Sequence, residues 1–132
     1  MASIFTRIVK GEIPCYKIAE NERFFAFLDI NPLVAGHTLV IPKEETDYIF
    51  DLEDEVLAEM MVFAKMVAKA IRQAVPCLRV GISVIGLEVP HAHVHLIPLN
   101  SLSDTNFSKE RPIISAEKFL QIQKDICQKL EV

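Results

Sequence analysis

Hydrophobic and polar residues change their spacing several times along the chain, and each change predicts an element of secondary structure. Alternating or continuous apolar runs, rich in β-branched and aromatic residues, predict strands over residues 16–20, 23–30 and 37–42. The turn-forming sequences "NE" and "NPLVAG" separate these runs. Two later runs, 78–86 and 91–99, predict two further strands joined by the short segment "LEVP".

Two other stretches carry apolar residues at steps of three and four, which is the period of an amphipathic helix. The first begins at Asp51 with an acidic turn that suits the positive end of a helix dipole, and it ends at Pro76. The second runs from Ser115 onward. The order β-β-β-α-β-β-α predicts an α+β fold, with a mostly antiparallel five-stranded sheet, one long central helix and a C-terminal helix.

Composition narrows the class of protein. The 132 residues are expected to form one domain, 1–132, and 51% hydrophobic residues without a bilayer-length apolar run predict a soluble globular protein. No apolar block of signal-peptide length stands near the N-terminus, so the expected compartment is the cytoplasm. Three widely spaced cysteines do not predict a disulfide framework. A net charge of −4 with scattered cations predicts neither nucleic-acid nor membrane binding.

The candidate chemistry centres on "VPHAHVHLIP", residues 89–98, in which His91, His93 and His95 alternate with apolar residues. On a strand, these three imidazoles are expected to share one face. They could simply be core or solvated histidines of a sheet, or they could bind a metal ion. At about 3.3 Å per residue, however, the outer two Cα atoms lie roughly 13 Å apart, so at most two of the three rings reach one ion easily. A third ligand would have to come from His37 or from a carboxylate such as Glu88.

Nucleophilic catalysis makes smaller geometric demands. A neutral imidazole attacks phosphorus when one ring nitrogen is held as N–H and the other points at the target. This hypothesis gives His93 the attack and leaves His91 and His95 to donate hydrogen bonds to the developing charge.

These residues resemble the histidine triad family, whose motif is His-φ-His-φ-His-φ-φ, with φ apolar. The motif stands here at residues 91–97, and "SIFTRIVKGEIP" and "AFLDINPLVAGHTLVIPK" extend the resemblance to the Hint-like branch over most of residues 3–98. The resemblance implies a two-fold homodimer that hydrolyses or transfers a nucleoside monophosphate, usually adenylyl, without a cofactor. It makes His93 the covalent nucleophile, places His95 by the phosphoryl oxygens, and has His37 join His91 in supporting the site.

The resemblance also implies a nucleoside pocket in the first half of the chain. Asp29 matches the position whose carboxylate takes the ribose hydroxyls, and a carboxylate accepts two charge-assisted hydrogen bonds from a diol. The apolar positions matched around a purine could equally be core residues; they are Phe5, Ile8, Phe27, Ile30 and Leu39.

The sequence departs from the family before the triad. The segment "SVIGLEVPHAH" is shorter than usual, with Leu87 in place of Gln, Glu88 in place of Ser or Thr, and Pro90 without an N–H. Glu88 must point away from a phosphate, be protonated, or face a cationic leaving group such as an amine. Ser83 is a candidate to replace a missing Asn. Some relatives open with Cys-x-x-Cys as half of a structural zinc site; the serine and threonine in "SIFT" predict none here.

Three functions follow from these observations. The leading hypothesis is a metal-independent nucleotidyl hydrolase or transferase that acts on a purine nucleoside phosphoramidate or phosphoanhydride. The second is a purine-nucleotide-binding interaction protein with weak catalysis, and the third is a metal-dependent hydrolase.

Overall fold

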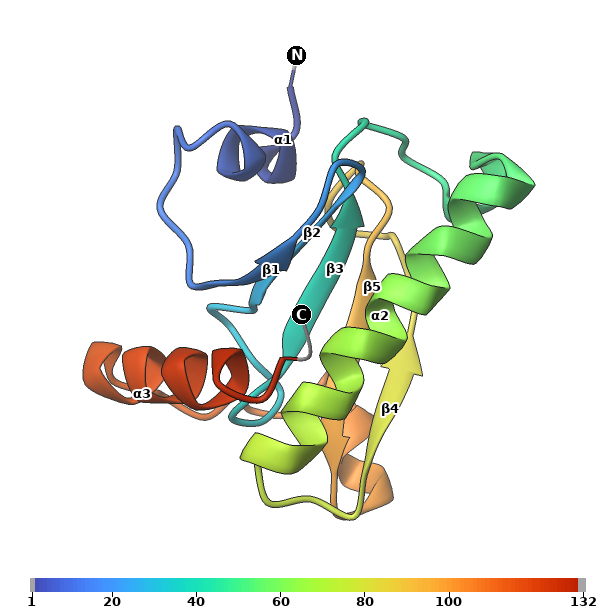
Figure 1. Cartoon of the computed structure of the whole chain (residues 1–132). Helices are drawn as coiled ribbons and strands as arrows, with labels where there is room; N and C mark the ends of the chain where they lie inside the picture. The colour runs from blue at the N-terminus through green and yellow to red at the C-terminus, as the bar shows by residue number, and fades with distance from the viewer. Residues whose placement is uncertain (1, 131–132) are drawn as a thin grey trace.

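A five-stranded sheet in the order β1-β2-β3-β5-β4 forms the centre of the computed structural model, which describes residues 2–130 (Figure 1). Every neighbouring pair of strands is antiparallel. The strands are β1 Lys17–Glu20, β2 Phe24–Leu28, β3 Thr38–Pro42, β4 Arg79–Ser83 and β5 Val94–Leu99. The predicted α+β fold with its five-stranded sheet is confirmed.

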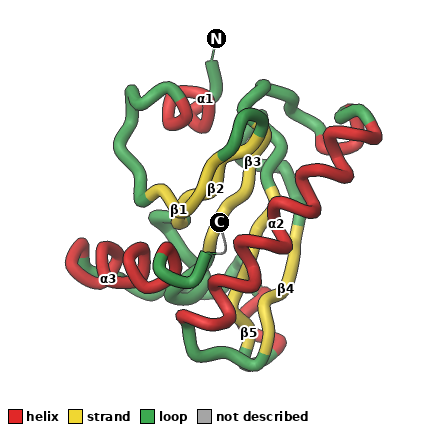
Figure 2. Tube along the Cα trace, viewed as in Figure 1, coloured by secondary structure: helices red, strands yellow, loops and turns green. Residues whose placement is uncertain are grey.

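Three helices flank the sheet, and Figure 2 shows the long one crossing it diagonally. They are α1 Ile4–Val9, α2 Asp54–Ala74 and α3 Ala116–Cys127. α2 is shorter than the sequence predicted, because residues Ile49–Asp51 form a separate 3-10 turn. Ser115 caps α3 by accepting a hydrogen bond from the backbone N–H of Lys118. Within residues 2–130, no helix is both long enough and apolar enough to cross a bilayer.

Both faces of the sheet are covered, which explains the continuous apolar runs of its central strands. Alternate residues of β2 point in opposite directions, so Phe24 and Leu28 pack toward α2 and α3, while Phe25 and Phe27 pack toward α1. Phe5 of α1 completes the smaller cluster. The α1 face of the sheet, opposite to α2, therefore carries aromatic and apolar groups beside the histidines.

Three sequence expectations are wrong in detail. The helix α1 was not predicted. The strands expected over 78–86 and 91–99 are shorter, because the chain leaves the sheet after Ser83 and returns only at Val94. Gly86, with φ of 75°, lies in this excursion in a backbone conformation that favours glycine. His91 and His93 therefore precede β5, and only His95 lies on the strand.

Candidate active site

A hollow of about 300 Å³ contains the rings of His93 and His95 together with the carboxylate of Asp29. Residues 85–88, before the triad, and residues from the loop after β5 complete its lining. Larger hollows occur elsewhere, such as one of about 690 Å³ between β2 and α2, but no histidine lines that one. The smaller hollow is therefore the candidate active site, because its lining includes two histidines and a carboxylate.

Strand register places several predicted site residues in one row. Leu39 on β3 is opposite both Phe27 on β2 and His95 on β5, and His95 is in turn opposite Ser83 on β4. Directly opposite residues project from the same face of a sheet. The four side chains therefore form a row on the α1 face, in which a rigid sheet carries His95 between an apolar and a polar neighbour.

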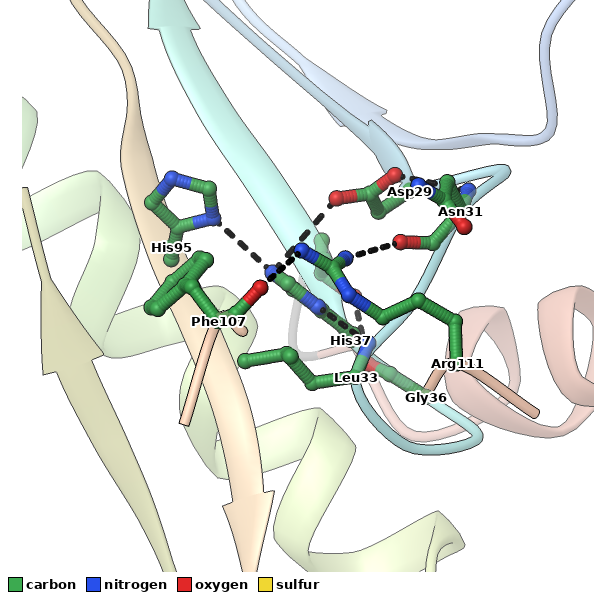
Figure 3. A network of polar contacts seen from close by, with 9 residues as sticks. Asp29, Asn31, Leu33, Gly36, His37, His95, Phe107 and Arg111 are labelled. Atoms are coloured by element: carbon green, nitrogen blue, oxygen red, sulfur yellow. Dashed lines mark hydrogen bonds and ion pairs between the residues drawn. The ribbon is translucent and has the colours of Figure 1, made fainter. Parts of the chain in front are cut away.

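The tautomers of His37 and His95 follow from their partners (Figure 3). The backbone N–H of Leu33 donates to His37 Nδ1 at 3.0 Å, so a neutral His37 carries its proton on Nε2. That Nε2–H donates to His95 Nδ1 at 2.9 Å. The proton of a neutral His95 is consequently on Nε2, the ring atom that is not engaged by His37.

Burial keeps both rings neutral. The pKa of His37 falls to about 3 and that of His95 to about 4, in each case chiefly because burial disfavours the charged form. Nearby positive charge contributes in the same direction. Near pH 7 the pair therefore presents one N–H donor, on His95, and no positive charge.

His93 is held in the complementary tautomer. Its Nδ1 lies 2.7 Å from the carbonyl oxygen of His91, and because a carbonyl only accepts, Nδ1 carries the proton. The lone pair of a neutral His93 is then on Nε2. Every fully buried polar side-chain atom within residues 2–130 has a partner, and Nε2 of His93 and of His95 has none, so both atoms are open to the hollow. The hollow thus brings an unprotonated ring nitrogen of His93 next to the N–H donor of His95.

An aromatic ring fixes the orientation of His93. Phe5 contacts it edge-on, with ring centroids 5.0 Å apart and planes at 82°. The His93 and His95 rings are also 5.0 Å apart. Phe5 therefore packs directly against the candidate nucleophile.

His91 faces away from the hollow. Its Nε2 donates to the carbonyl of Pro42 at 2.8 Å, and its Nδ1 accepts from the Ser3 hydroxyl at 2.8 Å. Burial lowers its pKa. Its backbone carbonyl accepts from His93 Nδ1, whereas His37 contacts His95 and not His91.

A hydrogen-bonded network ties the start of α1 to this histidine. Glu45 accepts from the Ser3 backbone N–H at 2.6 Å and from the Thr6 hydroxyl at 2.7 Å, and Ser3 contacts His91. These contacts lower the pKa of Glu45 to about 2. Two hydroxyls, a carboxylate and one imidazole are a poor donor set for structural zinc, which prefers thiolate and imidazole. The residues do not fit the zinc site of the Cys-x-x-Cys relatives.

A second group of potential metal ligands is Asp29, His37 and His95, whose ligand atoms lie within 4.8 Å of one another. Coordination through His37 Nε2 would move the proton of a neutral ring to Nδ1, where it meets the N–H of Leu33. The two donors would then face each other. Because of this conflict, His37 is better suited to donating a hydrogen bond to His95 than to binding a metal ion.

The residues matched to a nucleoside pocket occupy different environments. Asp29 lines the hollow; burial raises its pKa, and its Oδ1 accepts from the N–H of Asn31 at 2.8 Å. Phe5, Phe27 and Leu39 are buried, and Ile8 packs beside them, half-buried. Ile30, by contrast, is 72% exposed. Glu88 lines the hollow, whereas Ser83 is only its neighbour in the sheet.

Sequence reasoning missed the residues that close the hollow from the C-terminal side. Phe107, Ser108 and Arg111 line it, and they lie in the polar loop between β5 and α3. Figure 3 shows Phe107 and Arg111 beside His95 and His37. The Phe107 ring contacts His95 edge-on, with centroids 4.9 Å apart. The one available signal was an aromatic residue and an arginine in an otherwise turn-forming loop.

The chain matches known proteins across most of its length. Residues 10–102 match the HIT domain family. Adenosine 5′-monophosphoramidases of Schizosaccharomyces pombe and Saccharomyces cerevisiae are 43% and 42% identical; each alignment covers 74% of this chain, and they cover 74% and 62% of the respective relatives. A crystal structure of a Hit-like protein from Bartonella henselae superposes with a TM-score of 0.82 at 28% identity, covering 97% of this chain and 96% of that one. The chain therefore belongs to the HIT family, as a Hint-like member.

Proposed function

We propose that this protein is a nucleotidyl hydrolase or transferase that acts at the α-phosphorus of a purine nucleoside phosphoramidate or related phosphoanhydride. One observation carries the proposal: the free lone pair on His93 Nε2 opens into the hollow beside the N–H of His95. A nucleophile and an electrophile-stabilising donor are the two groups that such a displacement requires. The similarity to the two yeast phosphoramidases supports the same class of substrate.

The reaction proceeds in two displacements. His93 Nε2 forms a bond to the α-phosphorus, and the bond from phosphorus to the leaving group breaks, with the leaving group taking up a proton from solvent. The Nε2–H of His95 donates to the phosphoryl oxygen as charge develops there. Water then attacks the nucleotidyl-histidine and breaks its P–N bond, which releases the nucleoside monophosphate and the free ring of His93 and returns one proton to solvent.

The nucleoside is held from the other end of the hollow. Asp29 takes the ribose hydroxyls through the oxygen that Asn31 leaves free. The purine packs against the apolar group formed by Phe5, Ile8, Phe27 and Leu39, with Ile30 exposed at its rim. Glu88, on the leaving-group side, favours a neutral or cationic amine over a further phosphate.

The test is release of AMP from adenosine 5′-phosphoramidate in the presence of EDTA, with an adenylyl label that is labile in acid and stable in base, as a P–N bond requires, sought on the protein by mass spectrometry. We expect turnover without metal and a transient adduct on a peptide that contains His93. AMP binding without release would favour the second candidate, a nucleotide-binding protein, which the unusual Leu87 and Glu88 make worth testing. Release that requires an added metal ion would contradict the mechanism.

We also propose that two copies pair along the edge strand β4. Within residues 2–130, β4 has only β5 as a neighbour. Exposed apolar side chains follow this edge at Ile82, Val84 and Ile85. A free edge beside an exposed apolar strip is a surface that natural proteins usually cover.

Replacing Ile82 by Asp is expected to convert the dimer to a monomer, because the substitution places a charge where two apolar strips meet. Leu120 on α3 supplies the matched control, since Ile82 is 55% exposed and Leu120 is 56% exposed. Sedimentation equilibrium should give a mass near twice 14.9 kDa for the unsubstituted protein and for Leu120→Asp. For Ile82→Asp it should give the mass of one chain, 14.9 kDa. A monomeric unsubstituted protein would refute the pairing.

A further inference from the structure

Arg111 lines the hollow, and Figure 3 shows its side chain reaching from the loop before α3 toward Asn31 and Phe107. One guanidinium nitrogen donates to the carbonyl of Asn31 at 2.6 Å, and the other donates to the carbonyl of Phe107 at 3.1 Å. The guanidinium also lies 5.7 Å from the centre of the Phe107 ring. These contacts connect Arg111 to the loop after β2 and to its own loop, so its charge has a defined position.

The same contacts relate Arg111 to the histidines. Phe107, which the guanidinium overlies, packs edge-on against both His95 and His37. The Arg111 charge favours the ionised form of Asp29 and disfavours protonation of His37 and His95, although burial is the larger cause of each pKa shift. Arg111 is thus electrostatically coupled to both ends of the site.

Within residues 2–130, no carboxylate pairs with the charge of Arg111. Among residues 2–130, no Asp or Glu oxygen lies within 4.0 Å of its nitrogens, and both of its hydrogen-bond partners are neutral carbonyls. A guanidinium has five N–H groups, so three remain for a ligand. Lys109, two residues earlier, instead pairs with Asp104 at 3.6 Å.

The rest of the hollow needs such a cation if it is to hold a phosphate. Asp29 and Glu88 line it, while His95 is neutral at pH 7. Arg111 is the one Lys or Arg among its lining residues. An anionic ligand that faced only the two carboxylates and neutral rings would be repelled.

We propose that Arg111 is a substrate-binding residue that holds the α-phosphoryl oxygens of the nucleotide through its free N–H groups. The inference rests on the proposed function and adds to it the origin of phosphate affinity, which the altered segment 86–90 does not supply. Arginine suits this task because its planar fork matches two phosphate oxygens. It also makes the loop after β5 part of the substrate site.

The test compares AMP with adenosine, which lacks only the phosphate. Affinities are measured by calorimetry for the unsubstituted protein, Arg111→Gln, Arg111→Lys and the control Lys109→Gln. We expect Arg111→Gln to weaken AMP binding by about 10- to 100-fold while adenosine binding stays constant, because a charge-assisted bidentate contact is lost. Arg111→Lys should retain part of the affinity, and Lys109→Gln should retain all of it.

Salt dependence separates ligand binding from a structural role. AMP affinity of the unsubstituted protein should fall with added NaCl, and the slope should be smaller for Arg111→Gln. Equal weakening of AMP and adenosine would show that Arg111 only supports the loop, and unchanged AMP binding would show that it has no role; either result overturns the inference while the proposed function stands. If the unsubstituted protein does not bind AMP at all, the proposed function itself fails.

Discussion

Replacement of His93 by Ala is expected to abolish AMP release from adenosine 5′-phosphoramidate, with a loss of about 10⁴-fold or more in kcat, as for other removed catalytic nucleophiles. The reason is specific to this ring. Its Nδ1–H donates a hydrogen bond to the carbonyl of His91, so its Nε2 is the ring nitrogen that is open to the hollow. Release can be followed by chromatographic separation of AMP, with EDTA present throughout.

His93→Gln provides the matched control, because a side-chain amide retains an N–H donor but has no nucleophilic nitrogen. AMP should still bind to this variant, since the proposed contacts of Asp29 and Arg111 are untouched. Turnover that persists in His93→Ala would show that another group attacks phosphorus. Loss of AMP binding in both variants would instead indicate that the ring is needed to shape the hollow.

The free energy of unfolding is expected to fall by about 3 to 5 kcal/mol between pH 6.5 and pH 4.5. His37 and His95 have pKa values of about 3 and about 4 in the folded protein, against about 6.5 in an unfolded chain. Above pH 6.5 both states are neutral and stability is complete. Below pH 6.5, the two rings bind protons in the unfolded chain but stay neutral in the folded protein. The free energy of unfolding therefore falls by about 1.4 kcal/mol per pH unit for each ring.

Urea denaturation at half-unit pH steps measures this dependence. His95→Asn removes one of the buried rings whose pKa is lowered in the folded protein, which are His37, His91 and His95, so the slope against pH should decrease by about one proton, whatever the variant does to stability at pH 7. Glu45, whose pKa falls from about 4.5 in an unfolded chain to about 2 in the folded protein, loses its stabilising contribution between these two values, so it acts mainly below this window and only begins to act at its lower end. A free energy of unfolding that is constant from pH 6.5 to pH 4.5 would show that the pair accepts protons in the folded state.

The longest elements of the fold were predictable from spacing alone. Apolar residues recur at helical steps along residues 54–74, which make nearly six turns. β2 and β3 are apolar enough to identify strands covered on both faces. Helix α1 was missed because six residues give little periodicity, and its clearest signal is the cap at Ser3. Such a short helix is stabilised by tertiary contacts, here those of Phe5, which local sequence does not reveal.

The site was predictable in its composition more than in its geometry. Alternation suggested one strand with three aligned rings, but the chain between Gly86 and His93 runs outside the sheet. His91 therefore turns to Pro42, and His37 becomes the partner of His95. Arg111 was absent from the prediction because it lies in a loop. The position of a loop residue depends on the three-dimensional path of the chain, and the spacing of apolar and polar residues does not indicate that path.

The network of Ser3, Glu45 and His91 also has a consequence for how the protein becomes active. Its bonds join residues separated by 42 and 88 positions, so closing it requires distant parts of the chain to meet. Contacts of such high sequence separation are costly to form early in folding. The His91 carbonyl that orients His93 should consequently reach its final place late in folding, after the sheet is assembled. Recovery of catalytic activity during refolding would then indicate that the whole domain has folded, rather than any one part of it.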